Sequence, residues 1–312
     1  MTHRRALIGM LVATLLWSTA GVVTRQLEQA HSFEVTFWRS FFTVLTLGLY
    51  FAATRGRAAM AVFANGGRPL VVSGLMWSVM FTCFMLALTL TSVANVLITM
   101  SLSPLFTALL ARFMLGAPVA RRTWVAILLA GVGIAWMYAH KISAEPEALL
   151  GTLVALAVPL AAAVNWVTIQ RNSSAGGAAV DLMPALLIGA VLSCVISLPF
   201  AWPLQGSLHD IGWLAGLGVF QLALPCLLAV HVARGLAAPE VALLSLLEVV
   251  FGIAWAWLGA GERPLPQVLV GGSLVLGSLA VNEFIGMMGR RNAAAAADLT
   301  ARPGSTSVHP HV

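Results

Sequence analysis

The stretch that decides the fold is residues 94–117, ANVLITMSLSPLFTALLARFMLGA, because its pattern returns at residues 240–262 as EVALLSLLEVVFGIAWAWLGAGE. The two copies align at a constant offset of 145 residues, which pairs Asn95 with Glu240, Ser103 with Glu248, Phe106 with Phe251 and Gly116 with Gly261. An offset close to half of 312 residues indicates an internal duplication. Each copy is a helix-length apolar run, and duplicated apolar bundles are typical of proteins that move a solute across a bilayer.

Composition identifies lipid as the solvent of this chain. Hydrophobic residues make up 60% of the sequence and charged residues only 9%, so a soluble domain would lack the polar side chains to cover its surface. A spanning helix needs roughly 20 mainly apolar residues. Ten stretches meet that need, at about residues 6–24, 35–54, 69–89, 94–115, 123–140, 150–170, 183–202, 211–231, 240–259 and 266–287. The predicted fold is an all-α integral membrane protein with ten transmembrane helices.

The basic residues set the predicted orientation. With the N-terminus in the cytoplasm, most arginines fall on the inner side, and only Arg25, Lys141 and Arg263 face outward. Both termini are then cytoplasmic. The net charge of +6 follows from this topology and from contact with anionic lipid, so membrane lipid rather than nucleic acid is the expected charged partner. The first apolar run has the layout of an export signal, but its counterpart deep inside the chain predicts that it stays as a helix.

An odd number of helices in each half makes the second half enter the membrane in the opposite sense to the first. We therefore expect two inverted five-helix repeats, at residues 1–147 and 148–289, and a disordered cytoplasmic tail at residues 290–312. In transporters built this way the substrate site lies near the midplane between the repeats. Rocking of one repeat against the other then exposes the site to alternate sides of the membrane.

Polar and aromatic side chains at mid-depth are the candidate substrate-binding residues. Pro104 interrupts the helix that carries Asn95 and Thr99, and interrupted helices at mid-depth are typical of binding sites. The full predicted set is Trp17, Ser18, Trp77, Asn95, Thr99, Asn165, Trp166 and Glu248. Helix packing is the alternative explanation for the tryptophans, and hydrogen bonds to their own helix are the alternative for the hydroxyl side chains.

Two charged residues carry separate hypotheses. Glu248 is the one carboxylate that the predicted spans place near the middle of the bilayer, and the cost of an intramembrane acid makes it a functional candidate by default. It either carries a coupling proton, or receives a substrate ammonium group, or is protonated and hydrogen-bonded to a neighbouring helix. Arg39, near the outer end of its helix, either reaches outward or binds a carboxylate at the cavity mouth.

Signals of catalysis or of a bound cofactor are absent from the sequence. Cys83, Cys194 and Cys226 lie in apolar spans without a CxxC spacing, and neither a Walker-type loop nor a dinucleotide fingerprint is present. We therefore expect no enzyme activity, no catalytic residue, no metal, no cofactor and no direct use of ATP.

Several motifs together resemble the drug/metabolite transporter superfamily, EamA type. They are LTSVANV from Leu90, LSPLFTALL from Leu102, LLEVVF from Leu246, LGAGERP from Leu258, the glycine run at 271–277 and Phe37-Trp-Arg39. The resemblance covers residues 6–287. It implies ten helices in two inverted repeats, a central cavity lined mainly by helices one, three, four, six, eight and nine, and export of amino acids or other small metabolites across the bacterial inner membrane. The chain departs from the family pattern at Ala117, where an acid is expected, and at Val249, where a proline is expected.

The resulting hypothesis is a secondary transporter that exports small metabolites, with neutral or aromatic amino acids first, by alternating access. Scarce buried charge favours a neutral or zwitterionic solute, and protons are a candidate coupling partner. Within transport, the alternative is an exporter of lipophilic cations or drugs, held by tryptophan rings and neutralised by Glu248. In another class, the alternative is a membrane channel or scaffold that does not cycle. A channel should carry a polar stripe along the full depth of some helices, whereas polar residues here cluster at mid-depth.

Overall fold

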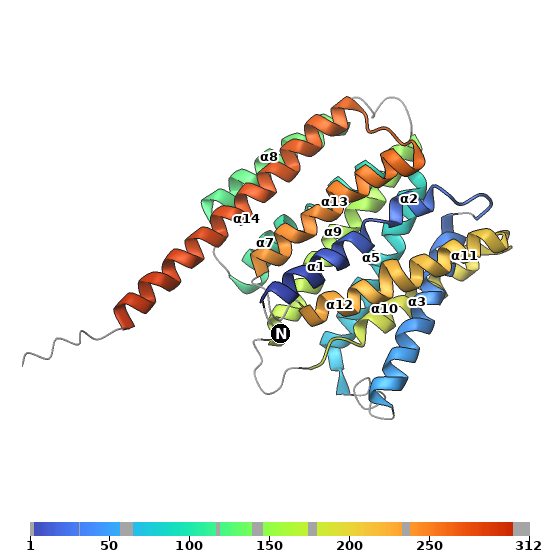
Figure 1. Ribbon diagram of the computed structural model, residues 1–312, viewed down its shortest axis with the longest axis horizontal. Helices are drawn as coiled ribbons and strands as arrows, with labels where there is room; N and C mark the ends of the chain where they lie inside the picture. The colour runs from blue at the N-terminus through green and yellow to red at the C-terminus, as the bar shows by residue number, and fades with distance from the viewer. Residues whose placement is uncertain are drawn as a thin grey trace, which may run out of the picture.

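The computed structural model describes residues 3–30, 32–56, 65–116, 119–138, 146–173, 180–232 and 238–301. Within these ranges every regular element is helical, which confirms the predicted all-α class (Figure 1). The first half carries α1 (His3–Trp17), α2 (Ala20–Thr24), α3 (Ser32–Arg55), α5 (Gly67–Leu90), α6 (Val93–Met100), α7 (Ser103–Leu115) and α8 (Arg121–Tyr138). The second half carries α9 (Pro146–Ser173), α10 (Ala185–Ala201), α11 (Leu208–Gly216), the π-helix η2 (Leu217–Ala223), α12 (Leu224–Val232), α13 (Ala238–Ala260) and α14 (Pro266–Ala301).

Seven of the described segments are long and apolar enough to cross a bilayer: His3–Thr24, Ser32–Arg55, Gly67–Leu90, Val93–Met114, Leu149–Ile169, Leu208–Val232 and Pro266–Gly289. Two shorter apolar helices, Ala185–Ala201 and Leu244–Ala260, pack in the same bundle. The chain is therefore built as a multi-pass membrane protein, while the count of ten spans and the repeat boundaries stay predictions. α14 continues as a helix to Ala301, past the predicted start of the tail, and residues 302–312 lie outside the described ranges.

Three of the spanning segments are interrupted, between α1 and α2, between α6 and α7, and at η2. Pro104 stands in the first turn of α7, where it has no N–H to donate to the carbonyl of Met100. The Ser103 hydroxyl donates to that carbonyl instead, at 2.7 Å. At the first break the Ser18 hydroxyl donates to the Leu15 carbonyl, also at 2.7 Å. Side-chain hydroxyls thus satisfy backbone groups that lipid cannot.

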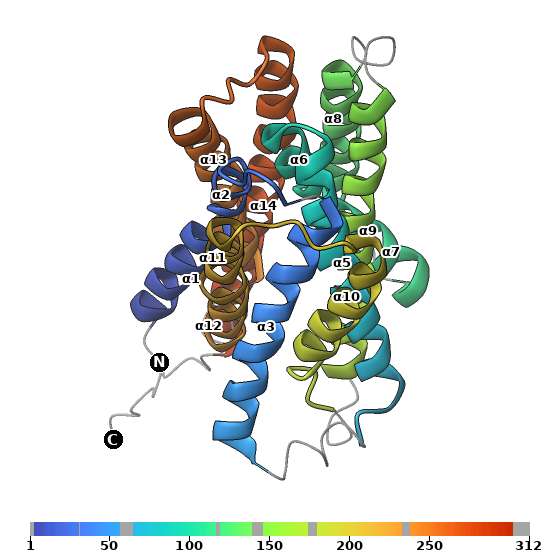
Figure 2. The same ribbon diagram turned by 90° about the vertical axis from the view of Figure 1, so that its right-hand side faces the viewer.

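Helix contacts recur when the two halves are exchanged. α5 packs against α9, and α1 packs against α12; α6 and α7 pack against α9, and α1 and α2 pack against α13. α10 lies against α5, as α3 lies against η2, and α3 and α10 also lie against each other (Figure 2). This exchange is the contact pattern expected of a duplicated bundle.

The backbone repeats at the end of the duplicated stretch as well. Gly116 ends α7 with a φ of 66°, and Gly261, its counterpart at the offset of 145, follows α13 with a φ of 67°. A left-handed φ of this size is easy for glycine and strained for other residues. The same turn therefore ends the same helix in both halves.

α8 and α14 run alongside each other as a close pair (Figure 1). A Cβ added at Gly133 would lie 2.6 Å from the carbonyl oxygen of Gly271, so the absence of side chains lets the two backbones touch. Nearer the end of the pair, the Thr123 hydroxyl donates to the Asn282 side-chain oxygen at 3.0 Å. This closely packed pair forms one edge of the bundle (Figure 1).

Candidate functional site

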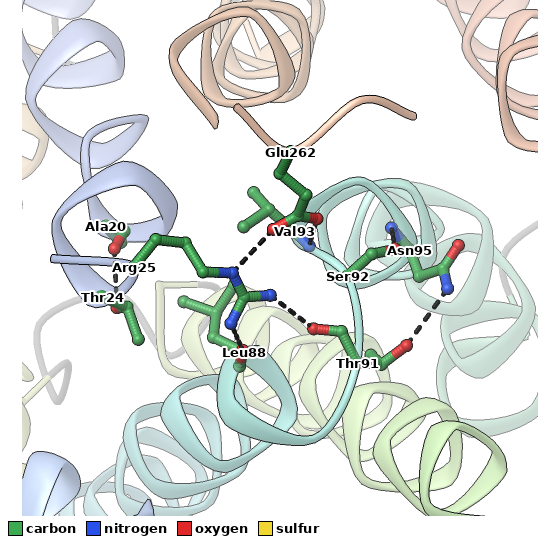
Figure 3. A network of polar contacts seen from close by, with 9 residues as sticks. All are labelled: Ala20, Thr24, Arg25, Leu88, Thr91, Ser92, Val93, Asn95 and Glu262. Carbon is green, nitrogen blue, oxygen red and sulfur yellow. Dashed lines mark hydrogen bonds and ion pairs between the residues drawn. The ribbon is translucent and has the colours of Figure 1, made fainter. Parts of the chain in front are cut away.

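Arg25 follows α2 and joins segments that are far apart in the sequence (Figure 3). Its Nε donates to Glu262 Oε2 at 2.6 Å, and its two Nη groups donate to the carbonyls of Leu88 and Thr91 at 2.7 and 2.8 Å. Glu262 in turn accepts from the backbone N–H of Val93 at 2.7 Å. The arginine thus meets the carbonyl end of α5 and the glutamate meets the N–H end of α6, the helix ends that favour these charges. We call these five residues the Arg25 network, and this end of the bundle the Arg25 end.

Two buried carboxylates organise the loops at the Arg25 end. Asp210 accepts backbone hydrogen bonds from residues 28–30 at 2.9 to 3.0 Å, and it is wholly buried at the start of α11. Glu34, also wholly buried, accepts from the backbone N–H groups of Gln205 and Gly206 at 3.0 and 2.8 Å. Each half therefore holds a loop of the other half by charge-assisted bonds to its backbone.

Asn95 and Asn165 each have a buried polar atom without a hydrogen-bond partner among the described residues. Asn95 Nδ2 donates to the Thr91 hydroxyl at 3.1 Å, whereas its Oδ1 has no partner. Asn165 Oδ1 accepts from the Ser73 hydroxyl at 2.6 Å, whereas its Nδ2 has none. A buried polar atom without a partner costs about 1–3 kcal/mol, and such atoms in native proteins call for an explanation. Thr99, on the same helix as Asn95, is also fully buried.

The break between α1 and α2 is where Trp17 and Ser18 lie. The carbonyl of Trp17 accepts from Gln221 Nε2 at 3.2 Å, which connects α1 to η2. The hydroxyl of Ser18 accepts from the indole of Trp255 on α13 at 3.1 Å. Both predicted residues therefore stand at a junction of helices from the two halves.

Of the remaining two predicted tryptophans, Trp77 packs against the same hydrophobic cluster as Trp17, whereas Trp166 is largely exposed. Trp77 packs on Phe81, with ring centroids 5.3 Å apart, and its backbone touches Gly189 of α10, so it serves the contact between α5 and α10. Trp166 is 49% exposed on α9, next to the buried Asn165. The structure does not bring Trp166 together with the other predicted residues.

Arg39 lies deeper than the sequence suggested. It is 1% exposed, which rules out the outward reach that was one of the two possibilities for it. Its Nη1 donates to Gln221 Oε1 at 3.3 Å and its Nη2 to the carbonyl of Phe81 at 2.8 Å. The guanidinium also lies 5.9 and 5.8 Å from the ring centres of Phe81 and Phe84.

Glu248 completes a set of polar groups around the start of α12. It is half-buried on α13, and the described residues supply it with no hydrogen bond and no ion pair. Cys226, buried at the start of α12, lies within electrostatic range of both Arg39 and Glu248. We call Trp17, Arg39, Gln221, Cys226 and Glu248 the central polar cluster.

Gln221 and Cys226 are members of this cluster that sequence reasoning missed. Gln221 is a lone amide in an otherwise apolar span, and that is the signal which marks it. Its place in a π-helix, a feature frequent at functional sites, is not visible in the sequence. In the part of the chain that the structure describes, no three His, Cys, Asp or Glu side chains group as metal ligands. The expected absence of metal and cofactor stays a prediction.

The sequence model of the EamA-like transporter family matches the chain twice, at residues 4–139 and 149–283. The chain belongs to this family. The resemblance to EamA-type drug/metabolite transporters is thereby confirmed, and the two matches fall on the two halves of the duplication.

Among the relatives of this EamA-family protein are two kinds of small-molecule transporter. The S-adenosylmethionine uptake transporter of Rickettsia prowazekii is 26% identical over 204 residues, which cover 64% of this chain and 65% of the relative. The pseudopaline exporter CntI of Pseudomonas aeruginosa is 26% identical over 278 residues, 86% of this chain and 93% of the relative. The chain thus matches just under two thirds of the length of the Rickettsia relative. A solved crystal structure matches with a TM-score of 0.60 at 19% identity, over 91% of this chain and 99% of the other, which supports the fold alone.

Proposed function

We propose that this EamA-family protein is a secondary transporter that exports a small zwitterionic metabolite, with amino acids as the first candidates, across the bacterial inner membrane. The observation that carries the proposal is the central polar cluster, because it gathers a buried arginine, an amide and a carboxylate inside an apolar helix bundle. Such groups are expensive in lipid and mark solute paths. Both termini are proposed to lie in the cytoplasm, which places the Arg25 end at the outer face.

Alternating access is proposed as the mechanism. In its favour, helix contacts recur when the halves are exchanged, and the spanning segments are interrupted in both halves. Two of the interruptions lie where Ser18 and Gln221 stand, so polar groups and breaks in the α-helical backbone coincide there. Asn95, Thr99 and Asn165 are proposed as further substrate contacts, and Glu248 is proposed as the site of proton coupling.

The two relatives bear on the solute and on the direction. One relative is named for uptake and the other for export, and the exporter matches over more of its length. Export is therefore the proposed direction. S-adenosylmethionine contains the amino acid methionine, as its name says, which agrees with an amino-acid-like solute. Neither name is that of a drug exporter, so the lipophilic-cation alternative is not favoured.

The test is transport by the purified protein in liposomes. Labelled amino acids are offered outside liposomes that contain either buffer or the same unlabelled amino acid, with protein-free liposomes as the control. A carrier that alternates gives saturable uptake that unlabelled amino acid inside accelerates, because the loaded carrier returns faster than the empty one. Uptake without saturation or acceleration would instead indicate a channel, and no uptake of any amino acid by folded protein would refute the proposed solute class.

A further inference from the structure

We infer that the central polar cluster is a two-point site for a zwitterion, in which Arg39 binds the carboxylate of the solute and Glu248 binds its ammonium group. The inference rests on the transport function proposed above and specifies its substrate class. Each step follows from the contacts of one member of the cluster.

Arg39 is a buried cation with no anion beside it among the described residues. The described residues place no carboxylate within ion-pair distance of it, although removing a charge from water costs several kcal/mol unless the charge is compensated. Its two neutral acceptors and the nearby rings of Phe81 and Phe84 offset only part of that cost. An anionic group of the solute would supply the negative charge that the described residues do not place beside Arg39.

The guanidinium also has unused donors in the right arrangement. Within the described part of the chain, two of its five N–H groups are engaged, by Gln221 and by Phe81, and Nε is buried with no partner. Nε and an adjacent Nη form the edge that binds both oxygens of a carboxylate in parallel. The bond to Gln221 is long, at 3.3 Å against a usual 2.9–3.0 Å, so a charged acceptor would compete with it readily.

Gln221 fixes where that edge points. Its side-chain oxygen accepts from Arg39, and its side-chain nitrogen donates to the carbonyl of Trp17. The amide therefore spans the distance between α3 and the break after α1, and the π-helical turn of η2 presents it to both. Gln221 is therefore a positioning residue, which orients the guanidinium of Arg39.

Glu248 provides the second point of attachment. It is half-buried and has no partner among the described residues, so its carboxylate is available to an ammonium group. α13, the helix that carries Glu248, contacts the break after α1, where the indole of Trp255 donates to the Ser18 hydroxyl at 3.1 Å. Gln221 joins Arg39 to the same break, so the cation and the anion stand on helices that meet there. A small solute with both charges fits this arrangement, and a solute with one charge leaves the other residue uncompensated.

The competing explanation is that Arg39 serves only to hold α3 against α5 and η2 through its hydrogen bonds. Selectivity between analogues separates the two explanations, because a purely structural contact affects folding and not the recognition of a carboxylate. The probes are phenylalanine, leucine, methionine and threonine, each paired with the amine that lacks its carboxylate and with the acid that lacks its amino group. Competition by each analogue against the labelled parent amino acid is measured in the liposomes described above.

Wild-type protein should bind the parent amino acid at least tenfold more tightly than either analogue. In Arg39→Gln the amine should compete as well as the parent, and in Glu248→Gln the deaminated acid should do so. Arg39→Lys keeps the positive charge but loses the paired N–H groups that bind both carboxylate oxygens, so it should recover part of the selectivity that Arg39→Gln loses. Arg55→Gln is the matched control, because Arg55 stands on the same helix, pairs with Asp181 at its end, and should leave the ratio unchanged.

Several results would overturn the inference. If the wild type accepts either analogue as well as the parent, the two-point site is wrong even if no variant folds. If Arg39→Gln or Glu248→Gln folds and keeps the wild-type ratio, the corresponding contact is wrong. Both outcomes leave transport of amino acids intact, whereas absence of any amino-acid transport by folded wild type would refute the proposed function instead.

Discussion

Replacement of Glu262 by glutamine tests the Arg25 network most directly. Glutamine keeps the size of the side chain and one acceptor oxygen, but it loses the charge that faces Arg25 at 2.6 Å and the N–H of Val93 at 2.7 Å. A hydrogen bond to a charged group is worth about 1.5–3 kcal/mol. The two side chains are 27% and 22% exposed, and exposed pairs are worth far less. We therefore expect Glu262→Gln to lower the free energy of unfolding by about 1–2 kcal/mol.

The assay is thermal unfolding in detergent, followed by tryptophan fluorescence, for Glu262→Gln, Arg25→Gln and the double variant. The two single losses should not add, because each removes the same ion pair. Glu28→Gln is the control, since Glu28 lies in the adjacent loop with an exposed side chain. Equal midpoints for the Glu28 and Glu262 variants would show that the Arg25 network contributes nothing measurable. Strict additivity in the double variant would show that Arg25 and Glu262 do not act as a pair.

Three further predictions follow from other contacts. Ser73→Ala removes the one side-chain bond of Asn165, so thermal unfolding should show a loss of about 1–3 kcal/mol. Gly271→Val places a side chain against the backbone of α8 and should cut the yield of folded protein in size-exclusion chromatography, whereas Gly277→Val, with open space around it, should not. Glu248→Gln should abolish any acceleration of transport by a pH gradient in liposomes; unchanged acceleration would remove the coupling role.

The fold class was predictable because hydropathy and duplication are properties of the sequence alone. Apolar runs of spanning length and the offset of 145 residues indicate a duplicated helical bundle without knowledge of any contact. Among the site residues, Ser18, Asn95, Thr99 and Asn165 are buried away from lipid, as polar groups in apolar spans generally are, and their role as substrate contacts stays a prediction.

The partners themselves were not predictable. Arg25 and Glu262 are 237 residues apart, and no local pattern reveals which helix ends they bridge. Arg39 gave no sign of its depth, because an arginine near a helix end is compatible with both an exposed and a buried position. Neighbouring residues on a helix of 3.6 residues per turn point about 100° apart, so Asn165 and Trp166 need not share an environment, and the sequence does not tell which of them faces the bundle. The structure buries the asparagine and exposes the tryptophan.

The duplication finally shows where the two ends of the bundle differ. Gln26, at the Arg25 end, donates to the carbonyl of Gly259, and Arg171 donates to the carbonyl of Met114, which is the counterpart of Gly259 in the first half. At both ends, a side chain at the end of the first spanning segment of one half thus donates a hydrogen bond to a backbone carbonyl of the fourth segment of the other half. The Arg25 end has in addition the carboxylate of Glu262, whose counterpart in the sequence is Ala117. If the halves alternate as proposed, each conformation closes one end, and the Arg25–Glu262 ion pair favours the conformation in which it is formed. At these equivalent positions the two ends therefore differ by one acidic residue that one copy carries and the other does not.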